Sequence, residues 1–344
     1  MFPAIRFAHC CLFTGIAFAT ASAESFRDPK EILEILEKSK FKYEISQDSS
    51  AFFDLRNLDA SPVAHAHPDW IVVVDSKGAR SLKQQIPTGC AAKEDSAALT
   101  AYSAKDYEAA VDGYRRAYEC DKSFVKALTY VGNSYFGMGK LDSAIFWLRK
   151  AIEANPDDYQ AHFFLSDAYL GRGNADSAYV EFVEAYLRNP NSDNLRKFAS
   201  VVLDMNGKQL DKSWPVFGFA VDSLAKGARI RLSEMTHLSM ATCIAAWMVD
   251  PALKSLRKDD DRIQQTRFRN CLANQVVHAV SAKGKDQPVD RISEKLARIA
   301  DGNLIGAMVV WERLARSRPE SIYTLPPEVK ARIRAYLAEA LELR

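Results

Sequence analysis

The chain has 344 residues, of which 48% are hydrophobic and 26% are charged, and its formal net charge is +2. This length allows two or three domains, and this hydrophobic content is ordinary for a globular protein with a substantial core. The nearly balanced charge excludes the broad electrostatic attraction to nucleic acid or to an anionic surface that strongly basic proteins show. We therefore expect no nucleic-acid partner.

The first 23 residues have the pattern of a secretory signal peptide. Arg6 supplies a positive charge, an apolar run follows from residue 7 to residue 19, and Ala21-Ser22-Ala23 is a small-x-small cleavage site. The apolar run is too short to span a bilayer comfortably, and an uncleaved anchor is the alternative. We predict a periplasmic or secreted protein that begins at Glu24 and has no integral membrane span after cleavage.

Residues 24–89 predict a small mixed α/β module. Asp28-Pro29 is typical of a helix start, with a capping aspartate and a proline in the first turn. Residues 41–45 and 51–55 favour strands. The strongest strand pattern is the apolar run at residues 71–74, which a turn at Lys77-Gly78 follows.

Residues 91–192 repeat with a period of 34. Three columns of matching residues carry this period: Ala110, Ala144 and Ala178; Ala117, Ala151 and Ala185; and Tyr114, Leu148 and Phe182. A period in this range is typical of helical hairpins that stack into a solenoid, with one hairpin in each unit.

The middle unit resembles the tetratricopeptide repeat family, whose pattern is W-x2-L-G-x2-Y, then A-x3-F, then P. The residues that match are Leu128, Val131, Gly132, Tyr135, Ala144, Leu148, Ala151 and Pro156. The third unit matches comparably, whereas the first is weaker and has Ala101 at the Tyr position. The resemblance implies a solenoid over residues 90–210, with repeats at 91–124, 125–158 and 159–192.

The chain after the repeats predicts further helices. Residues 194–206 form an amphipathic pattern that suits a helix capping the last repeat. Beyond Pro215 the period ends, and residues 216–344 predict an all-helical C-terminal domain. Its candidate helices lie at about 231–249, 261–281, 289–300, 303–317 and 326–343. The expected fold class is thus mainly α: a helical-hairpin solenoid, a small N-terminal α/β module and an all-helical C-terminal region.

The predicted mature chain keeps four cysteines, Cys90, Cys120, Cys243 and Cys271. An even number in an exported protein is compatible with two disulfides, and four thiols allow three pairings. In the repeat geometry Cys90 precedes the first helix of the first unit, and Cys120 lies near the end of its second helix. Antiparallel helices bring those ends together, so we expect a Cys90–Cys120 bridge, and we also expect a Cys243–Cys271 bridge.

The sequence lacks the zinc-helix, nucleophile-elbow, phosphate-loop and dinucleotide patterns. Ser123-x-x-Lys126 and residues 192–194 match two elements of penicillin-interacting enzymes, but the third, Lys-Thr-Gly, is absent. His65 and His67 have no third ligand nearby, so a loop is favoured over a metal site. We predict no catalytic residue, no metal and no cofactor.

Repeats of this family usually bind proteins or peptides in a concave groove formed by their first helices. The resemblance implies that the groove is lined by Leu99, Tyr102, Tyr130, Asn133, Phe136, Phe163, Asp167 and Leu170. Asp95 and Leu99 stand where some members have the Lys and Asn that hold a C-terminal carboxylate. An apolar stripe of this size, if exposed, marks a binding site. The alternative is that the protein's own C-terminal helices or N-terminal module fill the groove.

We predict a protein- or peptide-binding scaffold in the cell envelope, and not an enzyme. Phe136 and Phe163 are expected to anchor the partner, and Lys126 is expected at the surface. One alternative is an envelope hydrolase whose site lies in residues 24–89 or 216–344. Another is a carbohydrate- or peptidoglycan-associated protein that binds through exposed aromatic side chains.

Overall fold

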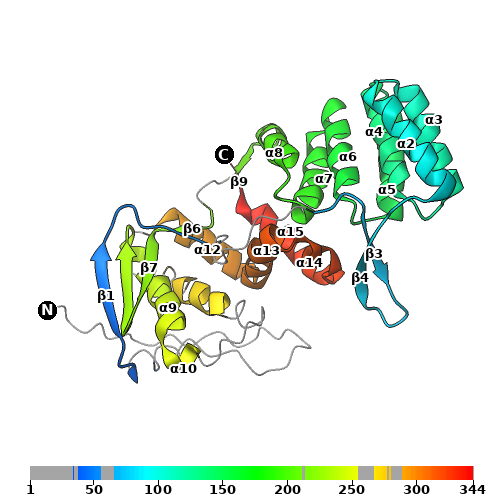
Figure 1. The fold of residues 1–344 in the computed structure, drawn as a ribbon. Helices are drawn as coiled ribbons and strands as arrows, with labels where there is room; N and C mark the ends of the chain where they lie inside the picture. The colour runs from blue at the N-terminus through cyan, green and yellow to red at the C-terminus, as the bar shows by residue number, and fades with distance from the viewer. Residues whose placement is uncertain are drawn as a thin grey trace.

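A computed structural model describes residues 34, 38–55, 66–210, 214–254, 267–276, 279 and 289–343. The predicted signal peptide and His65 lie outside these residues. In Figure 1 the repeat helices form one end of the molecule, a small β-sheet forms the other, and helices α13–α15 lie between them. The mainly α fold class is confirmed. Among the residues described, no helix is both long and apolar enough to cross a membrane.

The repeat region consists of consecutive antiparallel helices, in which α2, α4 and α6 are the first helices of three hairpins and α3, α5 and α7 are the second. The helices are α2 (Gly89–Ser103), α3 (Tyr107–Cys120), α4 (Lys126–Gly137), α5 (Leu141–Ala154), α6 (Tyr159–Gly171), α7 (Ala175–Arg188) and α8 (Asp193–Met205). Neighbouring helices in this order contact one another, and α4 also contacts α6.

One residue after each first helix adopts the left-handed backbone conformation. Gly139, Gly173 and Gly207 have φ angles of 71°, 73° and 65°, and Lys105 has a φ of 63°. Glycine adopts this conformation without the steric cost of a Cβ and therefore commonly ends helices. The four residues are 34 positions apart, and Gly207 follows α8. The predicted capping helix α8 is therefore the first helix of a fourth unit, in register with the other three.

The columns found in the sequence are the contacts that close each hairpin. At Gly132 in α4, an added Cβ would lie 2.5 Å from Cγ of Leu148 in α5. Ala144 and Ala151, on the same side of α5, are buried. These small residues let the two helices approach closely, and Leu148 fills the space between them.

The β-strands at the other end come from both ends of the chain. They are β1 (Lys42–Gln47), β2 (Phe53–Asp54), β6 (Val216–Phe217), β7 (Phe219–Leu224) and β8 (Gly227–Leu232). The main sheet has the order β1-β8-β7, with β1 parallel and β7 antiparallel to β8. β2 pairs with β6. β1 and β2, from the predicted N-terminal module, thus pair with strands from the region after the repeats.

Strands β6–β8 correct the expectation of an all-helical region after residue 216. In β8, Ala228, Ile230 and Leu232 are buried, whereas Arg229 is exposed and Arg231 is half-buried. This alternation has the period of two residues that a strand requires. Helix α9 (Leu238–Val249) contacts β7 and β8.

The remaining helices include segments that correspond to the candidates at 261–281, 289–300, 303–317 and 326–343, and two short ones, at 251–254 and 319–324, that were not predicted. They are α10 (Pro251–Lys254), a helical stretch at 267–276, α12 (Arg291–Asp301), α13 (Ile305–Ser317), α14 (Pro319–Thr324) and α15 (Pro327–Ala340). A short 3₁₀ helix, η2 (Met235–His237), precedes α9. The chain then forms β9 (Leu341–Leu343) instead of extending the last helix, and β9 pairs with β5 (Lys208–Leu210), directly after α8.

The C-terminal helices pack against the second helix of the third unit. α13, α14 and α15 each contact α7. The indole nitrogen of Trp311 donates a hydrogen bond to the carbonyl of Leu187 at 3.0 Å, and the Asn191 amide donates one to the carbonyl of Ala315 at 3.1 Å. The largest hydrophobic cluster is continuous from α7 and α8 to these helices and to the sheet.

A two-stranded hairpin, β3 (Trp70–Val74) and β4 (Arg80–Gln84), lies beside the turns between repeats (Figure 1). The side chain of Asn155 donates a hydrogen bond to the carbonyl of Trp70 at 3.1 Å, and the backbone nitrogen of Lys126 donates one to Oε1 of Gln85 at 3.1 Å. The hairpin therefore contacts the turns that precede α4 and α6.

Both expected disulfides are present. The Cα atoms of Cys90 and Cys120 are 5.9 Å apart, and those of Cys243 and Cys271 are 5.4 Å apart. The first bridge joins the start of α2 to the end of α3, as the repeat geometry predicted. The second joins α9 to the helical stretch 267–276.

The turn between α5 and α6 carries Asp157 and Asp158, both buried. Asp158 accepts hydrogen bonds from Nζ of Lys126 at 2.8 Å and from Oγ1 of Thr129 at 2.6 Å, and it caps α6. Lys126 is only 1% exposed, so the expectation that it lies at the surface is wrong. The sequence suggested a surface lysine because its partner belongs to the next repeat.

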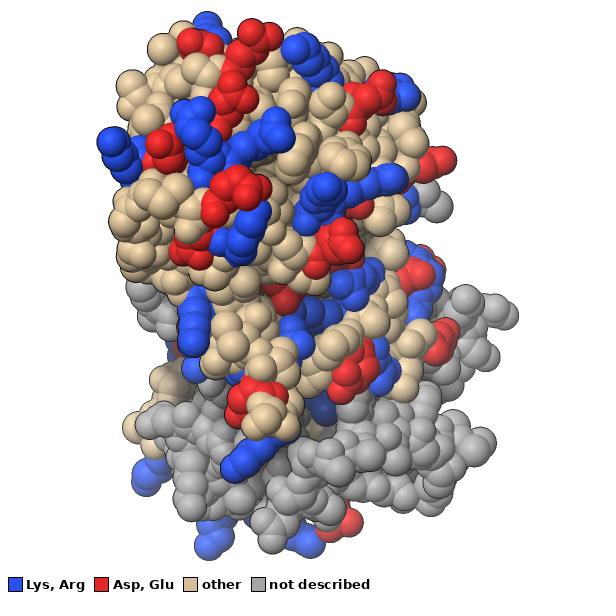
Figure 2. Space-filling view, turned by 90° about the vertical axis from the view of Figure 1, so that its right-hand side faces the viewer, with Lys and Arg blue, Asp and Glu red and all other residues tan. Residues whose placement is uncertain are grey.

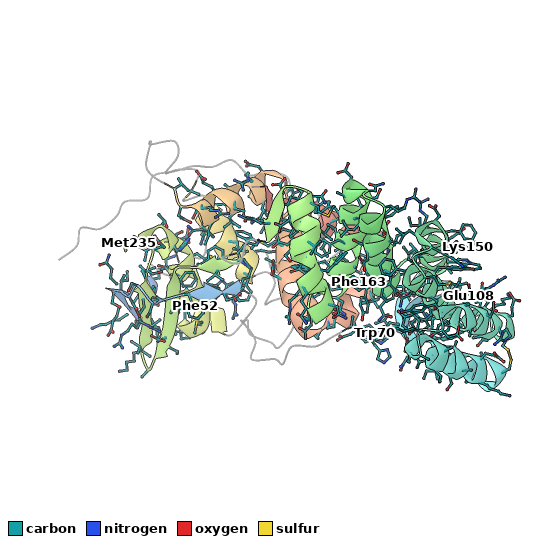
Figure 3. All side chains as sticks on the ribbon, turned by 90° about the horizontal axis from the view of Figure 1, so that it is seen from above. Phe52, Trp70, Glu108, Lys150, Phe163 and Met235 are labelled. Carbon is teal, nitrogen blue, oxygen red and sulfur yellow. A yellow bond between two sulfur atoms is a disulfide. The ribbon has the colours of Figure 1, made fainter. Side chains whose placement is uncertain are left out.

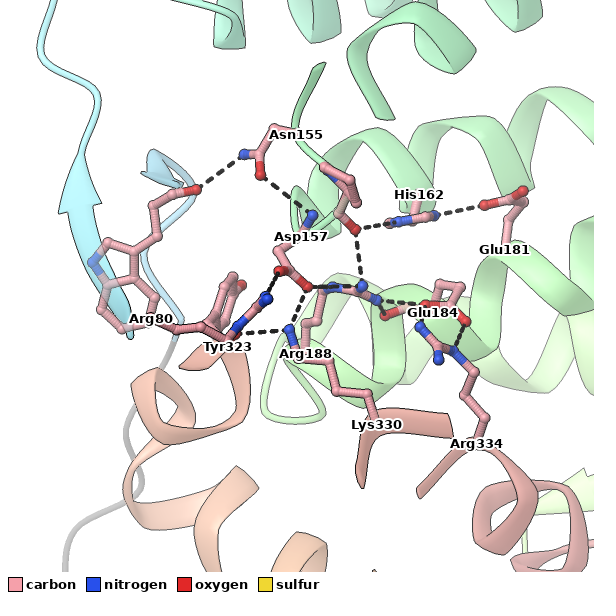
Figure 4. A network of polar contacts seen from close by, with 12 residues as sticks. Arg80, Asn155, Asp157, His162, Glu181, Glu184, Arg188, Tyr323, Lys330 and Arg334 are labelled. Carbon is pink, nitrogen blue, oxygen red and sulfur yellow. Dashed lines mark hydrogen bonds and ion pairs between the residues drawn. The ribbon is translucent and has the colours of Figure 1, made fainter. Parts of the chain in front are cut away.

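Asp157 joins three distant parts of the chain (Figure 4). Its carboxylate accepts hydrogen bonds from Lys330 in α15 at 2.7 Å, from Arg188 in α7 at 3.0 Å and from Arg80 in β4 at 3.4 Å. Burial acts to raise the pKa of Asp157, but Arg188 and Lys330 lower it. Burial lowers the pKa of Lys330 to about 8, against the attraction of Asp157.

Glu184 in α7 continues this network and predicts acid sensitivity. Burial opposes ionisation, but Arg334 and Arg188 hold the pKa of Glu184 at about 2, below its ordinary value of 4.5. The stabilisation is present above pH 4.5 and is lost as the pH falls towards 2, an effect of up to about 3 kcal/mol.

In denaturant unfolding at neutral and acidic pH, Glu184→Gln should be less stable than the wild-type protein at neutral pH, and its stability should depend less on acid. Glu153→Gln, on the exposed side of α5, is the control, and an unchanged acid dependence in Glu184→Gln would contradict the assignment.

The buried ion pair predicts that Lys126→Ala is strongly destabilising. Removing one partner of a buried pair leaves the other charge uncompensated, at a cost of about 3–5 kcal/mol. Lys93→Ala, at an exposed position of α2, should change the stability by no more than about 0.5 kcal/mol. Denaturant unfolding of the two variants tests this, and equal midpoints would mean that the Lys126–Asp158 pair contributes nothing.

Candidate binding groove

The first helices present two rows of side chains in their C-terminal halves. We call Leu99, Asn133, Asp167 and Val201 the 99 row, and Tyr102, Phe136 and Leu170 the 102 row. Members of a row are 34 residues apart and therefore occupy the same place on successive first helices. The sequence analysis named all of these residues except Val201, which it missed because α8 was treated as a cap and not as a repeat helix.

The 99 row is accessible at both ends. Leu99 is 56% exposed and Val201 is 49% exposed, although both are large apolar side chains. Asn133 and Asp167 between them are half-buried, as are the members of the 102 row. The Asn133 amide donates a hydrogen bond to the hydroxyl of Tyr102 at 2.9 Å and so connects the two rows.

Tyr130 and Phe163 lie nearer the beginning of their helices and have close aromatic neighbours. The Tyr130 ring is 5.1 Å from that of Tyr114, and the Phe163 ring meets Phe198 of α8 edge-on at 5.2 Å. In Figure 3, Phe163 lies in the middle of the molecule. Phe163 thus helps to hold α6 against α8 and belongs to neither row, so it is a poorer probe of binding than the members of the 99 row.

The protein's own chain borders one end of the groove face. Gln85 lies at the N-terminal end of α4, where its side chain accepts the hydrogen bond from the backbone nitrogen of Lys126. Burial raises the pKa values of Tyr130 and Asp95, and the nearby charge of Asp69 raises both further. The hairpin therefore lies at the N-terminal ends of the first helices, whereas the two rows lie towards the C-terminal ends. The C-terminal helices contact α7, a second helix.

Two carboxylates on the first helices have raised pKa values. Burial raises the pKa of Asp167 in α6. Burial, and then the nearby charge of Asp69, raise the pKa of Asp95 in α2. Among the described residues, neither carboxylate has a hydrogen-bond or ion-pair partner. The first helices therefore carry two half-buried carboxylates for which the described residues supply no cationic partner.

Comparison with known proteins identifies the repeats. Residues 135–200 match the family model described as tetratricopeptide repeat. The chain contains tetratricopeptide repeats. The matched segment runs from the end of α4 to α8 and so includes the helix that the sequence analysis treated as a cap. No curated protein matches the chain.

Three solved structures that are similar to about a third of this chain are two tetratricopeptide repeat domains and a secretion chaperone. The first repeat domain of Spaghetti (RPAP3), bound to the HSP90 peptide SRMEEVD, has 15% identity and a TM-score of 0.33 over 34% of this chain and 95% of that chain. The Arabidopsis OM64 repeat domain has 14% identity and a TM-score of 0.32 over 33% and 93%. The Yersinia enterocolitica type III secretion translocator chaperone SycD has 18% identity and a TM-score of 0.31 over 34% and 89%.

A surface hollow of about 350 Å³ lies at the turns that join α2 to α3 and α4 to α5. Its lining residues are Lys105, Asp106, Tyr107, Glu108, Met138 and Lys140. The ring of Tyr107, in this lining, meets that of Tyr102 in the 102 row at 5.3 Å. On the face shown in Figure 2, basic and acidic side chains are interspersed.

The described histidines have structural partners. His67 hydrogen-bonds with the side chain of Gln84 in β4 at 3.1 Å. His237 is buried, accepts a hydrogen bond from the backbone nitrogen of Gly218 at 2.8 Å, and lies 3.3 Å from a carboxylate oxygen of Asp290. Within the described ranges, no group of three or more His, Cys, Asp or Glu side chains could hold a metal ion.

Proposed function

We propose that the repeats form a protein- or peptide-binding scaffold whose partner lies across the 99 row and the 102 row. The observation that carries this proposal is the 99 row, in which four first helices in register place accessible apolar side chains at both ends of a continuous face. The protein's own C-terminal helices pack against α7 instead. Tetratricopeptide repeats are typically binding modules, which supports a non-enzymatic role.

The rows are suited to binding because they are already ordered. They lie on helices that are fixed by the glycine contacts and by the buried aspartates, so a partner would order few side chains on this surface. Covering an exposed apolar side chain such as Leu99 contributes roughly 1.5–3 kcal/mol. Aromatic side chains such as Tyr102 and Phe136 are typical of the residues that dominate binding energies.

We further propose that the scaffold works in the cell envelope after export. The signal-like pattern of residues 6–23 supports this, as do the two disulfides, because disulfides form and persist in oxidising compartments.

A pair of matched double variants tests the groove. Leu99→Gln with Val201→Gln removes the two accessible apolar ends of the 99 row. The control, Phe146→Gln with Val180→Gln, changes two residues that are also 34 positions apart and are 52% and 58% exposed on the second helices. Neither pair removes a buried side chain, so both proteins should unfold at nearly the wild-type temperature.

Partners captured by the wild-type protein from an envelope extract, and then purified, provide the readout. The groove pair should weaken their binding by at least about 2 kcal/mol, roughly thirtyfold, and the control pair should leave it unchanged. If the control pair loses binding and the groove pair retains it, the partner binds the second helices and the proposal is wrong.

A further inference from the structure

We propose that the segment bound in the groove carries lysine or arginine side chains, which pair with Asp167 and Asp95. This inference rests on the proposed function, because it names the chemistry of the partner for the same groove. The observation behind it is that two carboxylates on the first helices, on the face where the partner would lie, have no cationic partner among the described residues.

Asp167 is the first part of the evidence. It lies in the middle of the 99 row, between Asn133 and Val201 on the neighbouring first helices. Its carboxylate is half-buried and has no partner among the described residues. Burial disfavours the charged form of a carboxylate, and an opposite charge nearby restores it. A cationic side chain lying over the 99 row would supply that charge.

Asp95 on α2 is the second part. Its carboxylate is also half-buried and has no partner among the described residues. Burial, and then the charge of Asp69 just before β3, raise its pKa.

Among the described residues, no basic side chain of the first helices forms an ion pair with Asp95 or Asp167: Lys93 is exposed on α2, and Arg196 on α8 pairs with Asp193. Lys126 is buried and neutralised by Asp158 at 2.8 Å. Lys197 is exposed on α8, at the far end from Asp95. The face from α2 to α6 therefore fits a basic segment and would repel a segment rich in Asp and Glu.

The positions of the two carboxylates indicate a spacing for the cations. Adjacent packed helices lie about 8–10 Å apart, so Asp95 on α2 and Asp167 on α6, two steps apart, are separated by roughly 20 Å. An extended chain advances about 3.3 Å per residue. The expected partner is an extended segment with two basic side chains roughly six residues apart and apolar side chains between them, which would contact the 102 row.

Three synthetic peptides of equal length test the inference on the full mature chain. They share the same apolar residues and carry Lys, Ser or Glu at the two charged positions. Fluorescence anisotropy should show the tightest binding for the Lys peptide, weaker binding for the Ser peptide and the weakest for the Glu peptide. Added salt should weaken the Lys peptide and leave the Ser peptide nearly unchanged, because ions screen the charge pairs.

Asp167→Asn keeps the shape of the side chain and removes its charge. It should weaken the Lys peptide about fivefold to tenfold, leave the Ser peptide unchanged, and preserve or raise the melting temperature because an unpaired half-buried charge is removed. Asp112→Asn, which removes an exposed carboxylate from the second helix α3, is the control and should affect none of the peptides.

The outcomes separate this inference from the proposed function. If the Lys and Ser peptides bind equally, or if Asp112→Asn weakens the Lys peptide as much as Asp167→Asn does, the inference is overturned. Failure of all three peptides to bind also overturns it. The proposed function is judged independently, by whether the double variant of the 99 row loses the captured partner.

Discussion

Two consecutive carboxylates in the turn between α5 and α6 hold the different parts of this molecule together. Asp158 pairs with Lys126 and Thr129 of the preceding repeat and caps α6. Asp157 pairs with a side chain from the hairpin, one from α7 and one from α15. Because these groups are buried, each would be costly to leave unpaired, so the hairpin and the C-terminal helices are tied to the solenoid at this turn.

This arrangement determines which surface stays accessible. The hairpin is held at the N-terminal ends of the first helices, and the C-terminal helices are held against α7. The 99 row and the 102 row lie away from both attachments. At the turn, the buried carboxylates are paired with lysine and arginine side chains. On the first helices, Asp95 and Asp167 are half-buried and have no cationic partner among the described residues. In the proposed account, stability and binding therefore depend on different carboxylates of the same repeats.

Local periodicity was enough to predict much of this fold. The 34-residue columns placed the helices of the repeats, and the antiparallel hairpin explained the Cys90–Cys120 bridge. The helix predicted at 231–249 was correct over residues 238–249, where the apolar run is too long for an ordinary strand, and wrong over residues 231–237. The alternation of Ala228, Ile230 and Leu232 is typical of a strand, whereas the sequence analysis predicted an all-helical region there.

Contacts between residues far apart in the sequence could not be predicted in the same way. The partner of Asp157 in α15 is Lys330, and β1 pairs with β8 across the whole repeat region. No local pattern specifies such pairs. Lys126 illustrates the difficulty, since a lysine on a first helix reads as exposed until its partner in the next repeat is known. The groove rows themselves were predictable, because the period places them on one face.

Site-specific photo-crosslinking tests most directly whether the groove face is the binding surface. A photoreactive amino acid at Leu99 would probe the groove, and one at Phe146 would probe the second helices. The account predicts that, in the cell envelope, the Leu99 probe crosslinks to a second protein and the Phe146 probe does not. Crosslinks from Leu99 to this chain's own N-terminal or C-terminal residues, with no second protein attached, would show that the groove is filled from within and would contradict the account.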